Sequence, residues 1–164
     1  MNVKKLTLLS VSVALAMVLS FIESQIPPFV AVPGVKIGMS NIVTVFLLYK
    51  LGAKEAMAVS GIRVVLSALL FGSAVSLIYS LSGAVLSFVS MLCLKKTDKF
   101  STLGVSVLGG VMHNVGQIIA ACFIMETAAL SLYLPALLVS GILAGIAVGA
   151  IAGMLYYRLR NLKL

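Results

Sequence analysis

Acidic residues are scarce in this chain. Four aspartates and glutamates stand against twelve lysines and arginines, and Asp98 is the single aspartate. Magnesium-dependent phosphoryl or prenyl transfer needs several carboxylates to hold the metal ions. The P-loop, GxSxG and HExxH patterns of nucleotide-binding, hydrolase and zinc-protease sites are also missing. We therefore predict a protein that is not an enzyme, with no catalytic residues, no metal site and no cofactor of its own.

Cysteine is equally sparse, with Cys93 and Cys122 as the two examples. They fall in different apolar runs and are expected near opposite membrane faces, so we expect no disulfide between them. Two thiols without a nearby histidine ligand pattern also predict no metal site.

Charge of either sign is rare: 10% of the residues are charged, 62% are hydrophobic, and the mean hydropathy is +1.21. A soluble domain of 164 residues needs far more polar surface, so the lipid bilayer must be the solvent. The net charge of +8 does not indicate nucleic-acid binding, because the basic residues form small clusters between apolar runs. We expect residues 1–164 to form a single integral membrane domain whose first helix is retained rather than cleaved as a signal peptide.

Six apolar runs divide the chain. A helix needs about 20 mostly apolar residues to cross the hydrocarbon core, and the second run is short for that purpose. Its outer end is expected to be shielded by the preceding loop rather than by lipid. The predicted fold is therefore all-α and polytopic, with six transmembrane helices. The runs are Leu6–Ile22, Ile37–Tyr49, Glu55–Phe71, Ala74–Leu94, Leu103–Met125 and Leu130–Tyr157.

The basic residues orient this array. With the N-terminus in the cytoplasm, ten of the twelve cations fall on the cytoplasmic side, as the positive-inside rule favours. Both termini are then cytoplasmic, and the protein is expected in the cell membrane as a multi-pass protein. Lys36, at the outer end of the second run, and Arg63, within the membrane, are the two exceptions. The ten are Lys4, Lys5, Lys50, Lys54, Lys95, Lys96, Lys99, Arg158, Arg160 and Lys163.

Arg63 is the sole charge between Ala56 and Phe71 and so lies near the middle of a predicted span. A guanidinium at that depth costs about 3 kcal/mol on insertion scales and does not lose its proton. An anion or a strongly hydrogen-bonding group must therefore meet it. That partner is either a bound ligand or an internal carboxylate, for which Glu23 and Glu126 are available.

Other polar side chains are predicted to share the membrane interior with Arg63. On the fifth run they recur three and four residues apart and point roughly one way. Hydrogen bonding among themselves, to hold the helices together, is the structural alternative for each. Two fixed cations with histidine and amide donors suit a phosphate, diphosphate or carboxylate. The predicted substrate-binding residues are Lys36, Asn41, Arg63, Tyr79, His113, Asn114 and Gln117.

The last run carries glycine at every fourth position, at Gly141, Gly145, Gly149 and Gly153. Small residues at this spacing let two helix backbones approach closely in lipid. We expect this face to pack inside the chain, with a contact to a partner protein as the alternative.

Four blocks of the sequence resemble one family of membrane proteins. They are residues 32–44 (VPGVKIGMSNIVT), the block from Arg63-Val64-Val65 to Leu70-Phe71-Gly72, residues 80–83 (SLSG) and residues 113–117 (HNVGQ). These blocks resemble the signature of the Gx transporter family, which is also named heptaprenyl diphosphate synthase component I. That name implies prenyl transfer, but the aspartate-rich motif of such synthases is missing here.

The resemblance covers roughly residues 5–160 and implies the architecture of the substrate-binding S components of energy-coupling factor (ECF) transporters. Those are six-helix membrane proteins with both termini inside. The resemblance implies that the first outer loop caps the substrate and that two partner ATPases use ATP to drive toppling of the S component. It also implies that small residues of the first helix dock onto a transmembrane T component. Here these are Ser10, Ser12, Ala14 and Ala16, paired as Ser10/Ala14 and Ser12/Ala16 instead of Ala-xxx-Ala.

The leading hypothesis is therefore an S component that captures a small, anionic substrate from outside, under the loop from Pro27 to Lys36. An isoprenoid or quinone precursor is suggested mainly by the family name. One alternative is a non-catalytic membrane subunit associated with a prenyl diphosphate synthase. Another is a stand-alone transporter, which is disfavoured because the sequence shows no convincing inverted repeat and no carboxylate at mid-membrane.

Overall fold

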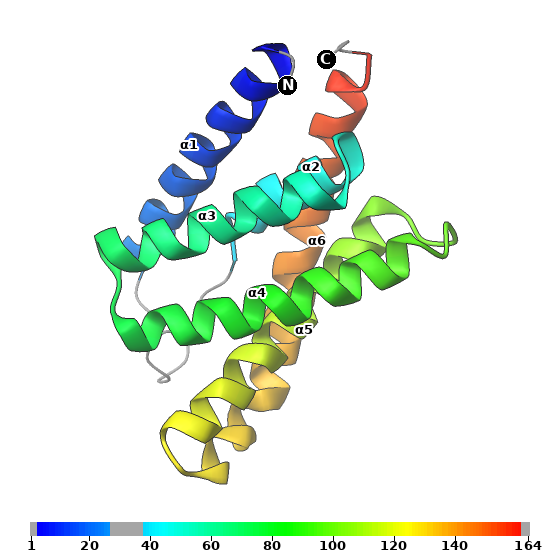
Figure 1. The fold of residues 1–164 in the computed structure, drawn as a ribbon. Coiled ribbons are helices and arrows are strands. Elements are labelled where there is room, and N and C mark those ends of the chain that lie inside the picture. Colours follow the sequence, from blue (N-terminus) through cyan, green and yellow to red (C-terminus); the bar gives the residue numbers. More distant parts are fainter. Residues whose placement is uncertain (1–2, 27–37, 162–164) are drawn as a thin grey trace.

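The chain folds as a set of packed helices, with no strand in residues 3–26 and 38–161, which are the residues that the computed structural model describes (Figure 1). The predicted all-α class is confirmed. The elements are α1 (Val3–Gln25), α2 (Asn41–Lys50), α3 (Ala53–Phe71), α4 (Ala74–Lys95), α5 (Thr102–Ile124), the short 3₁₀ helix η1 (Ala128–Tyr133) and α6 (Leu134–Leu159).

Four helical segments are long and apolar enough to cross a membrane: α1, α4, α5 and the η1–α6 unit Ala128–Leu159. α3 has 19 residues, but any 18 consecutive residues of it include three charges, Lys54, Glu55 and Arg63. α2 has 10 residues, about half of the ~20 that a full span needs. The chain is therefore a multi-pass membrane protein, and the prediction of six spans is confirmed for these four segments.

The short helix α2 lies at the centre of the packing. Its six consecutive residues 43–48 are all buried, as expected for a helix that is apolar all round and enclosed by protein. It contacts α1, α3, α5 and α6. Because its neighbours shield it from lipid, α2 does not need the length of a full span.

At one end of the molecule, lysine side chains donate hydrogen bonds to the last turns of neighbouring helices. Lys50 Nζ donates to the carbonyl oxygen of Leu159 over 2.6 Å, and Lys95 Nζ donates to the carbonyl oxygen of Leu48. The last carbonyls of a helix lack intrahelical partners and carry partial negative charge. Each lysine therefore supplies a cationic donor to the C-terminal turn of a neighbouring helix.

The starts of α1 and α3 meet through the ion pair between Lys5 and Glu55, 2.5 Å apart. Figure 1 shows both chain ends on the same side of the molecule. This arrangement brings together basic clusters that are predicted to lie on the cytoplasmic side. The membrane face on which this end lies stays a prediction of the positive-inside rule.

Glycines hold α6 closely against α5. Gly141, Gly145 and Gly149 are buried, and a Cβ added at Gly145 would lie 2.6 Å from the Cα of Val107. A Cβ at Gly149 would lie 2.9 Å from the Cα of Leu103. The two backbones therefore approach too closely for any side chain at these positions. Gly153 differs, since its nearest neighbour across the interface, the Thr102 side chain, would be 3.9 Å away.

Gly145→Ala is expected to lower the stability of the purified protein by about 1–3 kcal/mol, the usual cost of overpacking. Gly153→Ala is the matched control, because it brings the same gain in helix propensity without a backbone clash. Thermal unfolding in lipid nanodiscs measures both. Equal melting temperatures for the two variants would contradict the close α5–α6 contact.

The predicted orientation is testable by cysteine labelling in a background in which Cys93 and Cys122 are replaced. Lys99 lies in the α4–α5 connection and Glu126 follows α5, so the two exposed positions are at opposite ends of one span. In intact cells, a membrane-impermeant maleimide should label Glu126→Cys and should label Lys99→Cys only after permeabilisation. The reverse labelling pattern would contradict the predicted orientation and indicate the opposite one.

Candidate functional site

The Arg63 side chain is buried in the middle of α3, with 5% of its surface exposed. It shares the inward face of that helix with Ser60 and Ser67, which are also buried. Arg63 Nη2 donates a long hydrogen bond of 3.4 Å to Asn41 Oδ1 at the start of α2. Arg63 Nε is buried and has no hydrogen-bond partner among the described residues. A permanent cation is thus enclosed with part of its donor capacity unused.

Glu23 is the acidic residue beside Arg63. It is buried in the last turn of α1, with 6% exposed, and its carboxylate acts electrostatically on the Arg63 charge. Glu23 Oε1 also accepts a hydrogen bond from the backbone N–H of Gly38. Glu126, the other carboxylate considered from the sequence, is exposed. Of these two internal candidates, the fold therefore brings Glu23 to Arg63.

Gly38 connects this acid to two predicted site residues. Its φ of +86° is a conformation that side-chain-bearing residues rarely adopt. A Cβ at Gly38 would also lie 2.8 Å from Asn41 Nδ2 and 4.0 Å from His113 Cδ2. Gly38 thus lies between Glu23, Asn41 and His113.

His113 and Gln117 lie on the face of α5 that meets Gly83 of α4. A Cβ at Gly83 would be 2.9 Å from Gln117 Cγ and 3.0 Å from His113 Cε1. Gln117 is fully buried, and neither its amide nitrogen nor its amide oxygen has a hydrogen-bond partner among the described residues. An unsatisfied buried amide costs about 1–3 kcal/mol per polar group. We define the polar cluster as Glu23, Asn41, Arg63, His113 and Gln117.

Two further predicted binding residues, Asn114 and Tyr79, have contacts of their own. Asn114 donates to the Leu137 carbonyl over 2.6 Å and to Ser140 Oγ over 3.2 Å. The Asn114 amide therefore links α5 to α6. Consecutive helix residues are turned by ~100° from each other, so Asn114 faces α6 while His113 faces α4. Tyr79 is buried against Ala120 and Ala121 of α5, one helix turn beyond Gln117. The assignment of Asn114 and Tyr79 to the binding site stays a prediction.

Lys36 and the rest of the predicted cap, from Pro27 onward, lie outside the described residues.

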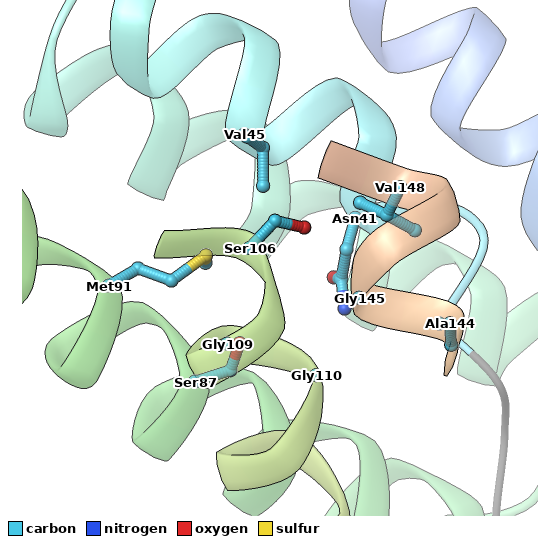
Figure 2. Close-up of a pocket in the computed structure, with 11 residues that line it drawn as sticks. Asn41, Val45, Ser87, Met91, Ser106, Gly109, Gly110, Ala144, Gly145 and Val148 are labelled. Atoms are coloured by element: carbon cyan, nitrogen blue, oxygen red, sulfur yellow. The ribbon is translucent and has the colours of Figure 1, made fainter. Parts of the chain in front are cut away.

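A cavity adjoins the polar cluster between α2, α4, α5 and α6. Its empty space is about 230 Å³, including the opening. Figure 2 shows the Asn41 amide and the Ser106 hydroxyl turned toward this space, with Met91 and Val148 on opposite sides. The lining residues are Gly38, Asn41, Val45, Ser87, Met91, Ser106, Gly109, Gly110, Ala144, Gly145 and Val148.

Sequence reasoning missed Gly38, Gly83 and Ser87 as parts of this region. Two of these residues could have been noticed in the sequence, because Gly38 and Gly83 lie within the blocks at residues 32–44 and 80–83. Ser87 follows Gly83 by four residues and so shares its helix face. Nothing in the sequence indicated that this face of α4 would meet α5.

The small residues of α1 divide between two faces. Ser12 and Ala16 are buried at 4% and 2% exposure, whereas Ser10 and Ala14 are exposed. The structure therefore places Ser12 and Ala16 inside this chain, where they are not available to a partner, because α1 packs against α2 and α3. Of the four predicted docking residues, Ser10 and Ala14 are therefore the two that are exposed.

No curated protein and no solved structure matches the chain significantly. A model of one protein family, described as heptaprenyl diphosphate synthase component I, matches residues 12–155. The match covers most of the chain, including all four sequence blocks and the whole polar cluster. The chain therefore belongs to the heptaprenyl diphosphate synthase component I family, also called the Gx transporter family.

Proposed function

We propose that this protein is the substrate-binding S component of an ECF-type importer and that it captures a small anionic molecule from the outside. The observation that carries this proposal is the buried Arg63, whose Nε has no partner among the described residues. The fully buried Gln117 amide, likewise without a partner there, supports it. Both groups offer hydrogen bonds that a ligand can accept.

An anionic headgroup suits this cluster for a geometric reason. The guanidinium presents several N–H donors in a rigid fork that matches carboxylate and phosphate oxygens. Glu23 offsets the charge of Arg63 over a distance, but its Oε1 is used by the Gly38 N–H. The ligand would thus complete the hydrogen bonding of a cation whose net charge is already partly balanced.

Transport by this chain requires partners. The sequence has no ATP-binding motif, so the proposal assigns ATP use to two ATPase subunits and coupling to a transmembrane T component. Ser10 and Ala14, exposed on α1 and four residues apart, would provide the small-residue face for docking onto the T component. The protein would work in the cell membrane.

We propose that the chain is not itself catalytic, because its four acidic residues are too few for the carboxylate-held metal ions of prenyl transfer. No group of three or more histidine, cysteine or acidic side chains suited to a metal ion occurs among residues 3–26 and 38–161. The family description names one component of a synthase, which favours a second candidate function: a non-catalytic membrane subunit that associates with a prenyl diphosphate synthase. A stand-alone transporter is the third, and ATP-independent uptake by the protein alone in liposomes would support it.

Arg63→Ala is expected to lower the amount of ligand that co-purifies with the protein from native membranes by at least about tenfold. The reason is that hydrogen bonds to a charged group contribute ~1.5–3 kcal/mol. Mass spectrometry of the extracted small molecules measures this loss. Arg63→Lys, which keeps the charge but not the fork, should retain an intermediate amount. Arg158→Ala, at an exposed arginine, is the control.

Circular dichroism and elution volume establish that each variant is folded. Undiminished ligand in a folded Arg63→Ala protein would rule out the proposed site.

Ala14→Trp is expected to abolish co-purification of the T component and the two ATPases from native membranes, because a large side chain keeps the two helix backbones apart. Ala147→Trp, at an exposed position on α6, is the matched control and should retain them. Recovery of a prenyl diphosphate synthase in place of the ATPases would favour the second candidate function.

A further inference from the structure

We propose that one ordered water molecule occupies the enclosed part of the cavity between α2, α4, α5 and α6, and that it bridges Asn41 on α2 to Ser106 on α5. This water ties the start of α2, where Asn41 meets Arg63, to the fifth helix. The bridge goes beyond the proposed function, because it has its own structural and energetic signature whether or not the chain carries a substrate.

The size of the space selects its occupant. The empty space of about 230 Å³ between these helices includes the opening, and the enclosed part has room for about one water molecule. An organic molecule does not fit in that part. The walls formed by α5 and α6 have little freedom to move apart or closer, since a Cβ at Gly145 would lie 2.6 Å from the Cα of Val107.

The Asn41 amide directs a donor toward this space. The Arg63 guanidinium has only N–H donors, so the Asn41 atom that faces Nη2 at 3.4 Å must be the oxygen, Oδ1. The amide nitrogen lies on the side of Gly38, where an added Cβ would be 2.8 Å from it. Gly38 and Asn41 both line the cavity, and Figure 2 shows the Asn41 amide turned toward it. Asn41 Nδ2 is therefore the first partner of the water.

Serine hydroxyls supply the other partners. Ser106 is 2% exposed, and Figure 2 shows its hydroxyl turned toward the cavity. Ser87 on α4 lines the same cavity, and its buried hydroxyl has no hydrogen-bond partner among the described residues. Buried waters typically make about three hydrogen bonds to polar groups that otherwise lack partners. Asn41, Ser106 and Ser87 offer such groups from three different helices.

The water extends the polar cluster to a further helix. Asn41 is the first residue of α2, and its amide oxygen already accepts from Arg63. With its nitrogen bonded to the water, the same amide connects the buried cation to Ser106. An amide nitrogen and a hydroxyl enclosed without partners would be unfavourable in the membrane interior, so the bridge stabilises both the α2–α5 contact and the position of Asn41.

A structure of the full chain at a resolution that shows ordered water tests the bridge directly. One solvent peak is expected at about 2.7–3.2 Å from both Asn41 Nδ2 and Ser106 Oγ. Ser106→Ala should remove this peak. Ser90→Ala, a matched change at a hydroxyl that bonds the Ser87 carbonyl of its own helix, should keep it. Absence of the peak in the wild type, its persistence in Ser106→Ala, or density for an organic molecule would each overturn the inference.

Unfolding of the same protein in nanodiscs gives an independent test. Asn41→Ala and Ser106→Ala each remove one partner of the water, so the second substitution has less left to disrupt. The unfolding equilibrium constant of the double variant should therefore rise at least about twofold less than the two single effects multiplied together. Asn41→Ala combined with Ser90→Ala should show no such coupling. Independent effects of Asn41→Ala and Ser106→Ala would contradict the bridge and would leave the proposed function untouched, because neither measurement involves a substrate.

Discussion

The burial of one permanent cation governs the arrangement of this protein. Arg63 lies inside a helix that otherwise presents apolar residues to lipid, and its guanidinium cannot become neutral. The inward face of α3 must therefore turn toward groups that accept hydrogen bonds or carry negative charge. Asn41 on α2 and Glu23 on α1 provide them. Three helices are thus tied to the position of a single charge.

Close contact between helix backbones shapes the part of the site that contains His113 and Gln117. Gly83 lets α4 approach His113 and Gln117, and Gly145 lets α6 approach α5. These contacts leave the Gln117 amide fully enclosed without a partner among the described residues. In lipid, such contacts replace the hydrophobic effect as a source of helix association. The same glycines that hold the bundle together thus shape the walls around the polar cluster and the cavity.

The molecule also separates its charges by position. Lys5 and Glu23 are 18 residues apart on α1, which corresponds to ~27 Å along the helix axis. The lysines at one end cap helix carbonyls, whereas the polar cluster lies well along the helices from that end. This separation agrees with the proposed function, in which the ligand binds away from the lysine-rich end.

The sequence by itself determined the all-α membrane class, the clustering of basic residues and the exceptional status of Arg63, because apolar run length and the cost of a buried charge are properties of local composition. It did not determine which carboxylate meets Arg63, since Glu23 and Glu126 both flank apolar runs. Only the tertiary structure decided that Glu23 is buried beside Arg63, that Asn114 turns to α6, and that Ser12 and Ala16 pack internally. Those outcomes depend on helix rotation and on which faces meet, and both are set by contacts between segments distant in the chain.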